Sequence, residues 1–246
     1  MKDDLSLLKD DQNYYGKVGK KYLSNSQIGT LLTNPLAFGQ ERPDNPAFMG
    51  GRLFHYLLIE PDKASTIPVV NASTRNTKAY KEFLAENNLP VALLSAEAES
   101  FKALAKRVKG NVHFFEQIYA LINEYEVPYI GELEGLDWKC KVDIVGADLI
   151  YDLKTTSDLR GFKHKASRYN YDSQAYIYHT LSGGKRMRFL VIDKTTGELG
   201  QFDASDAFME AGKDKVRRAS EVYKRYFGEG STESIQNRIR LPPLRV

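Results

Sequence analysis

The segment WKCKVDIVGADLIYDLK, residues 138–154, carries the pattern that decides the fold. Apolar and polar residues alternate along it on both sides of a Gly-Ala-Asp turn, which is typical of a β-hairpin. A two-residue loop at 147–148 places Asp143 opposite Asp152, and Lys154 points the same way two residues later. The other face of this hairpin then carries an apolar set that suits packing on helices: Val142, Ile144, Leu149, Tyr151 and Leu153.

Two directly opposed carboxylates, Asp143 and Asp152, repel each other. They persist in a folded protein when a cation lies between them or when one of them keeps a proton. Hard oxygen ligands favour Mg²⁺ or Mn²⁺, and a lysine such as Lys154 beside the ion can position an attacking water. The alternative is an exposed hairpin with solvated charges and a simple contact between Lys154 and Asp152.

The hairpin lies within an α/β pattern. Short strands are expected at 129–134, 138–145, 149–155, 187–193 and 198–202. Helices are expected from Pro46 to about residue 60 and at 76–87, 96–109, 112–123 and 171–181, with a last long helix from Ser205 to about residue 227. The order predicts a mixed central sheet flanked by helices, with a helical N-terminal portion.

One domain over residues 26–228 is expected, between a flexible N-terminal segment, 1–25, and an exposed C-terminal tail, 229–246. The chain has 246 residues, which fits one large domain. No apolar run approaches the roughly 18–20 residues that cross a bilayer, and the N-terminus lacks a signal-peptide pattern. We therefore expect a cytoplasmic protein with no membrane contact.

The sequence excludes a disulfide and three kinds of cofactor site. Cys140 is the single cysteine, so an internal disulfide, a Cys-ligated zinc site and an iron–sulfur cluster cannot form. The Ser-Gly-Gly-Lys run at 182–185 lacks the first glycine of a phosphate-binding loop, so no ATP-driven motor is expected.

A basic stretch from 160 to 188 contains seven Lys or Arg residues, a single acid and four tyrosines. Basic residues interleaved with aromatic ones suit a polyanion such as DNA. The candidates for contacts to phosphate are Arg160, Lys163, Lys165 and Arg168. A solvated helix face is the alternative.

Four ordered motifs resemble a known superfamily. They are Gly51-x-x-x-His55, Asp143, Asp152-x-Lys154 and Gln174-x-x-x-Tyr178. In this order they resemble the RecB-type branch of the restriction-endonuclease-like, or PD-(D/E)XK, nucleases. The flanking stretches GRLFHYLLIEP, WKCKVDIV, YDLKTTSD and YNYDSQAYIY resemble RecE-type phage recombination exonucleases. The resemblance covers roughly residues 21–227.

This resemblance implies roles for individual residues. His55, Asp143 and Asp152 would ligate the metal, and the Leu153 carbonyl would add a ligand. Lys154 would orient the nucleophilic water. The residues that would steady the active site and the DNA backbone are Gln174 and Tyr178.

Four candidate residues are considered one by one, and three of them have a purely structural alternative. His55 alone would more often be a packed core histidine, and Glu132 is either a further metal ligand or a surface strand residue. Arg52, beside the glycine of the first motif, is a candidate for DNA binding. Gly51 exposes backbone and would let DNA approach closely, unless it serves helix packing.

The function implied by the resemblance is an Mg²⁺-dependent, ATP-independent exonuclease that resects duplex DNA 5′ to 3′, with Mn²⁺ as a substitute. Its single-stranded product would pass to an annealing protein in recombination. A homo-oligomeric ring and a phage origin, hence the host cytoplasm, would fit the family. The alternatives are a structure-specific or single-strand nuclease and a non-catalytic DNA-binding module.

Overall fold

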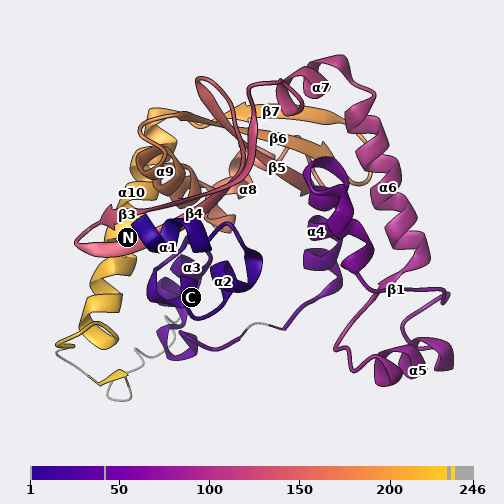
Figure 1. Ribbon diagram of the computed structural model, residues 1–246, viewed down its shortest axis with the longest axis horizontal. Helices are drawn as coiled ribbons and strands as arrows, with labels where there is room; N and C mark the ends of the chain where they lie inside the picture. Colours follow the sequence, from indigo (N-terminus) through magenta and orange to yellow (C-terminus); the bar gives the residue numbers. More distant parts are fainter. Residues whose placement is uncertain (1, 42, 232–233, 236–246) are drawn as a thin grey trace, which may run out of the picture.

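The computed structural model describes residues 2–41, 43–231 and 234–235, and its centre is a five-stranded mixed sheet (Figure 1). The strand order is β3-β4-β5-β6-β7, with β5 and β6 parallel and the other neighbours antiparallel. The bounds are β3 (Glu124–Leu133), β4 (Leu136–Val145), β5 (Leu149–Thr156), β6 (Arg186–Asp193) and β7 (Leu199–Asp203). The predicted mixed sheet with flanking helices is confirmed.

The turn between β3 and β4 sets the register of this strand pair. Glu134 and Gly135 both have positive φ, 54° and 65°, which is the conformation of a tight two-residue hairpin turn. Leu133 pairs with Leu136, and the same register holds from there to the far end of β3. It therefore places Glu126 opposite Asp143.

The β4–β5 hairpin turns where the sequence predicts, but its ladder is shorter than expected. Val145 pairs with Ile150 and Ile144 with Tyr151, and no further pair forms. Beyond that point the Asp143 carboxylate accepts a hydrogen bond from the backbone N–H of Leu153, at 2.8 Å. The predicted register is therefore confirmed at Val145 and Ile144, but the expected backbone pairing of Asp143 with Asp152 does not form, because the Asp143 side chain takes the place of the ladder there.

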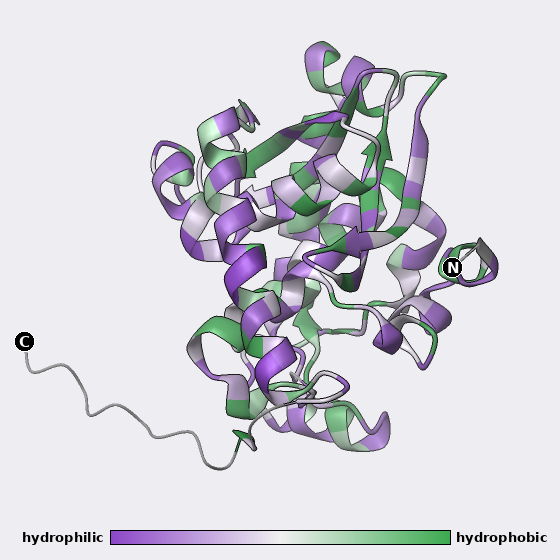
Figure 2. Ribbon diagram, turned by 90° about the vertical axis from the view of Figure 1, so that its left-hand side faces the viewer, coloured by the Kyte–Doolittle hydropathy of each residue, from purple (hydrophilic) through white to green (hydrophobic). Residues whose placement is uncertain are grey.

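Three helices cover one face of the sheet: α3 (Asn25–Thr33), α9 (Tyr171–Leu181) and α10 (Asp206–Tyr226). The short α8 (Phe162–Ala166) and η4 (Ser167–Tyr169) complete the crossover from β5 to β6. Ser205 begins α10 by accepting a hydrogen bond from the Phe208 N–H, as the sequence predicts. Trp138, Cys140 and Val142 of β4 pack into this core. Figure 2 shows the apolar colour concentrated in the strands beneath the helices.

The opposite face is covered by α4 (Pro46–Ile59), α6 (Ser95–Lys109) and α7 (Val112–Ile118). Ile144 and Leu153 pack here, whereas Val142 lies in the other core, so the predicted common face of Val142 and Ile144 is wrong. The helix expected over 112–123 ends at Ile118, because the Asn123 side chain donates to the carbonyls of Gln117 and Ile118 and closes the helix end.

A small satellite layer extends from α4. It contains η3 (Pro61–Thr66), β1 (Val69–Val70), α5 (Lys78–Glu86) and β2 (Leu93–Leu94), and the two strands pair in parallel. Another short turn, η2 (Pro35–Ala37), follows α3. No helix within the described ranges has both the length and the apolar content to cross a bilayer.

The N-terminal segment, expected to be loose, is folded. It forms α1 (Lys2–Leu7), α2 (Asp11–Tyr15) and η1 (Gly19–Lys21), and it buries Leu8, Tyr14 and Tyr22. The physical reason lies on β4: the ammonium of Lys139 donates to the Tyr14 carbonyl, and that of Lys141 to Asp11 at 2.6 Å. Of the expected tail at 229–246, the structure describes residues 229–231 and 234–235, and the rest lies outside the described residues.

Candidate active site

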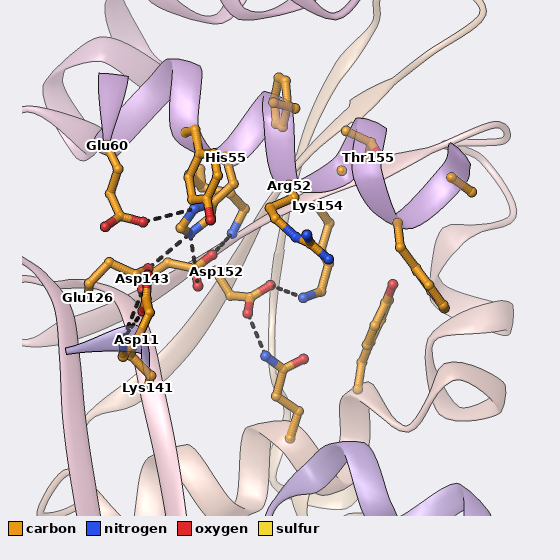
Figure 3. Close-up of a pocket in the computed structure, with 18 of the residues that line it drawn as sticks. Asp11, Arg52, His55, Glu60, Glu126, Lys141, Asp143, Asp152, Lys154 and Thr155 are labelled. Carbon is orange, nitrogen blue, oxygen red and sulfur yellow. Dashed lines mark hydrogen bonds and ion pairs between the residues drawn. The ribbon is translucent and has the colours of Figure 1, made fainter. Parts of the chain in front are cut away.

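A cleft of about 850 Å³ opens where β4 and β5 separate, between α4, α2 and α9 (Figure 3). Each of these elements contributes polar side chains to it. The charged or imidazole groups that line it are Asp11, Arg52, His55, Glu60, Glu126, Lys141, Asp143, Asp152, Lys154 and Lys194. Five acids and five basic groups thus share one cavity.

His55 stands at the centre of an acidic cluster. Its Nε2 lies 3.1 Å from Glu126 Oε1 and 3.4 Å from Asp143 Oδ1, and its Nδ1 lies 3.9 Å from Glu60 Oε2. Figure 3 shows the three carboxylates pointing at the ring from the residue after α4, from β3 and from β4. One ligand atom each from His55, Glu60 and Glu126 fits within 4.8 Å, a spacing that could hold a metal ion.

Asp152 and Lys154 form a second group on β5. Lys154 Nζ lies 2.5 Å from Asp152 Oδ2, and Gln174 on α9 donates from Nε2 to Asp152 Oδ1. The buried Oδ2 of Asp152 thus has the Lys154 ammonium as its partner. The Lys154 ammonium also lies 4.8 Å from the centre of the Tyr171 ring.

The two aspartates have opposite pKa shifts. Burial raises the pKa of Asp152 to about 6, assisted by the charge of Asp143 and opposed by that of Lys154. Burial also acts to raise the pKa of Asp143, but the charges of His55 and Lys154 and the Leu153 N–H outweigh it and lower that pKa. Near neutral pH without metal, Asp152 is thus the aspartate that holds a proton most readily.

Burial acts to lower the pKa of His55, but Asp143 and Glu126 outweigh it and raise that pKa well above its usual value. Burial, together with Asp143, raises the pKa of Glu126 against the influence of His55. Without metal, an imidazolium therefore neutralises part of the acidic cluster. A divalent cation would take over that role.

Glu126 reaches the cluster through a local break in β3. Its φ is +53°, a left-handed conformation that is rare for a residue other than glycine. Lys141 holds the other side of the carboxylate, with Nζ at 4.0 Å from Glu126 Oε2 and 2.6 Å from Asp11 Oδ1. The N-terminal helix α2 thereby supports the site.

Comparison with known proteins gives the family. Residues 34–233 match the model of the "PDDEXK-like domain of unknown function (DUF3799)". The chain belongs to this family. A crystal structure of a protein from Eubacterium rectale, described as "Putative exonuclease", has a TM-score of 0.64 at 18 % identity and covers 96 % of each chain. A structure of SSO0001 matches over 82 % of this chain and 87 % of its own at 13 % identity, with a TM-score of 0.31. No curated protein matches.

The PDDEXK-like assignment confirms the expected restriction-endonuclease-like core. Several predicted site residues meet in the cleft: His55, Asp143, Asp152, Leu153, Lys154, Gln174, Tyr178, Arg52 and Gly51. Arg52 also pairs with Asp44 at 2.7 Å. Burial raises the pKa of Tyr178 well above its usual value, so its hydroxyl stays protonated.

Other predicted residues lie elsewhere. Glu132 is exposed on β3, opposite Asp137, and does not line the cleft. The basic candidates on or near α8 and η4 also lie outside the cleft lining: Arg160, Lys163, Lys165 and Arg168. Lys165 pairs with Asp158 at 2.7 Å, whereas the other three side chains are exposed.

Five charged residues of the site were missed by sequence reasoning: Asp11, Glu60, Glu126, Lys141 and Lys194. Glu126 could have been found by counting back from the Glu134-Gly135 turn, since the register places it opposite Asp143. Glu60 ends the helix that carries His55. Lys194 lies in the turn after β6 and lines the cleft, and the residues around it in the sequence match no motif.

The donor set suits a hard divalent cation. Carboxylate oxygens from β3, β4 and β5 and one imidazole meet in the cleft. Oxygen-rich sites with few nitrogens favour Mg²⁺ or Mn²⁺ over softer metals. The residues present therefore fit such an ion.

Proposed function

We propose that this protein is a divalent-metal-dependent deoxyribonuclease that hydrolyses phosphodiester bonds in this cleft. The observation that carries the proposal is the convergence of Asp143, Asp152 and Lys154 with His55 and Glu126 on a PDDEXK-like fold. Binding alone does not need the carboxylates of Glu60, Glu126 and Asp143 within 4 Å of one imidazole. Their mutual repulsion is useful where a cation is to be held.

The ion would be held by His55, Glu126, Asp143, Asp152 and the Leu153 carbonyl, and Mg²⁺ is the expected ion, with Mn²⁺ as a substitute. When bound, it supplies Lewis-acid stabilisation of the negative charge that develops on the phosphate. Glu126 takes the place that the sequence reasoning gave to Glu132.

Lys154 would orient the attacking water. Burial acts to lower the pKa of Lys154, but Asp152 outweighs it and raises that pKa, so the side chain is a cation and not a base at neutral pH. An ammonium can donate to the water and stabilise charge on phosphorus. Gln174 fixes Asp152, and Asp152 in turn fixes the ammonium of Lys154.

The finer assignment is an ATP-independent exonuclease that resects duplex DNA 5′ to 3′. Its support is the likeness of the four motifs to RecE-type exonucleases and the exonuclease description of the Eubacterium rectale protein, which shares the fold. From the same resemblance, the product strands would pass to an annealing protein. A homo-oligomeric ring in the cytoplasm of a phage host is part of this proposal.

The DNA would contact Arg52 and Tyr178 in the cleft and continue along a basic track outside it. That track is formed by Arg160, Lys163, Lys165 and Arg168, which lie on or next to α8 and η4.

The test is incubation of closed circular and linear plasmid with Mg²⁺ or with EDTA. An exonuclease degrades the linear form alone, and only with Mg²⁺. Nicking of the circle would replace the proposal by an endonuclease. Retention of DNA in a gel without cleavage in either Mg²⁺ or Mn²⁺ would leave a binding module and overturn the proposal.

A further inference from the structure

Two aromatic rings at the cleft stand out because they are exposed. Tyr15, at the end of α2, is 70 % exposed, and Phe48, in the first turn of α4, is 58 % exposed. Among the described residues that line the cleft, they are the large aromatic side chains left open to solvent. They come from different elements, and both line the cleft that contains Asp143 and Lys154.

The backbone that carries Phe48 is fixed. Asn45 begins α4 by accepting a hydrogen bond from the Phe48 N–H, at 3.0 Å. Phe48, Gly51 and His55 follow each other at spacings of three and four residues, so they share one face of α4. This face leads from the exposed ring to the acidic cluster.

Gly51 leaves open space on that face. A methyl group at Gly51 would meet no atom within 4 Å outside its own helix, whereas at Gly50 it would collide with the ring of Phe101. Glycine in a helix interior costs up to about 1 kcal/mol relative to alanine. Packing gives no reason for Gly51, but close approach of a ligand does.

The charges beside the rings suit a phosphate backbone. Arg52, which pairs with Asp44, lies one residue after Gly51, and Lys194 lines the cleft from the turn after β6. The Lys194 side chain is exposed and contacts no carboxylate among the described residues. Exposed aromatic rings beside cations are the elements with which proteins bind single strands, because every base has a face for stacking.

We propose that the cleft accepts DNA as an unpaired strand, with Tyr15 and Phe48 stacking on bases next to the scissile phosphate and Gly51 leaving room for the backbone. This inference rests on the proposed function and specifies its substrate: a duplex end must be opened before a strand enters. Tyr15 and Phe48 are binding residues in this account, and the hydrolytic step does not depend on their chemistry.

The test compares two labelled oligonucleotides of equal length, one of thymidines and one whose central nucleotides lack bases. Fluorescence anisotropy measures binding to the full chain with Ca²⁺, which offsets the acidic cluster by binding carboxylate oxygens. The wild type should bind the thymidine strand about tenfold more tightly or better, consistent with stacking on exposed rings. The ratio of the two Kd values, abasic strand over thymidine strand, measures this preference. Tyr15→Leu and Phe48→Leu should each lower that ratio most of the way to one, while their binding of the abasic strand hardly changes.

Phe115→Leu is the matched control, because Phe115 is 47 % exposed on α7 and does not line the cleft. It should keep the wild-type ratio. Gly51→Leu, whose Cβ would meet no atom within 4 Å, should weaken binding of both strands. A wild-type ratio near one, or a ratio that survives in both ring variants, would overturn the inference.

Cleavage assayed separately with Mg²⁺ keeps the two proposals distinguishable. Cleavage together with a ratio near one refutes the stacking inference alone. A high ratio that falls in the ring variants, without any cleavage in Mg²⁺ or Mn²⁺, refutes the nuclease proposal and supports base stacking in the cleft.

Discussion

Glu126 stands opposite Asp143 across the β3–β4 pair, and both carboxylates contact the same nitrogen of His55, at 3.1 and 3.4 Å. Three independent features produce this arrangement: the tight turn at Glu134-Gly135, the left-handed conformation of Glu126 and the position of His55 on α4. The result is a site whose charge is balanced by an imidazolium without metal. A divalent cation should displace the proton.

Glu126→Gln should therefore weaken metal binding. In the wild type, Mn²⁺ should raise the free energy of unfolding by about 2.7 kcal/mol at one hundred times the dissociation constant. The variant should lose most of that gain, measured as the shift of Tm over a Mn²⁺ titration. Glu132→Gln, on an exposed position of the same strand, is the control and should respond like the wild type. An equal shift in the Glu126 variant would remove this residue from the site.

In the metal-free protein, Asp152 and then His55 should each subtract from stability as pH rises from 4 to above 7. The pKa of Asp152, raised by burial from 3.8 to about 6, adds a cost that builds up over that interval and reaches about 3 kcal/mol at 1.36 kcal/mol per unit. The pKa of His55 is raised well above 6.5 because Asp143 and Glu126 outweigh burial. Its stabilising contribution is complete below pH 6.5 and is lost as pH rises through the folded-state value.

Thermal melting in EDTA between pH 4 and 8 checks this dependence. His55→Gln should flatten the upper part of the curve, above pH 6.5, whatever its absolute stability. The Mn²⁺-induced rise in Tm should grow over the same upper interval, since the metal needs a neutral imidazole. Constant wild-type stability from pH 6.5 to 8 would contradict the imidazolium at this position.

Two neighbouring glycines of α4 should respond in opposite ways to alanine. Gly50 packs against Phe101, so Gly50→Ala should lower Tm because a methyl group there overlaps the ring. Gly51 faces open space, so Gly51→Ala should keep or raise stability, by up to about 1 kcal/mol from helix propensity. Chemical denaturation of both variants measures the difference, and a large loss at Gly51 would reveal packing that the fold does not account for.

The basic track outside the cleft should act through charge alone. Neutralising Lys163 and Arg168, both exposed, should weaken binding of all DNA sequences equally and reduce the slope of log K against log salt by about one unit per lost contact. Lys78→Gln on α5 is a control outside the cleft and the track. Binding titrations at several salt concentrations measure the slopes. If the double variant keeps the wild-type slope, these side chains form a solvated helix face.

The hairpin that carries Asp143, Asp152 and Lys154 was predictable because strand alternation and a two-residue turn are local signals. The end of its backbone ladder at Ile144 could not be predicted, because it depends on the Asp143 carboxylate turning toward the Leu153 N–H. The start of β3 was also missed. Glu126 leaves the regular strand conformation there, and Pro128 interrupts the pattern.

The N-terminal segment shows a different limit of sequence reasoning. Residues 2–21 are polar and contain no long periodic run, so nothing local indicates that they pack. Their place depends on Lys139 and Lys141, more than 120 positions away, which use Tyr14 and Asp11 as partners. Pairs at that separation are set by the assembled sheet and cannot be read from local periodicity.

Digestion of an end-labelled linear duplex by the wild type and by Lys154→Met tests whether the cleft is a nuclease site. Binding of the same duplex is measured in parallel. With Mg²⁺ the wild type should shorten the labelled strand. Lys154→Met should cut it several orders of magnitude more slowly while its Kd for the duplex stays nearly unchanged, because the lysine acts on the attacking water and not on affinity. Activity of the variant within about tenfold of the wild type, or no cleavage by the wild type in either Mg²⁺ or Mn²⁺, would contradict the account.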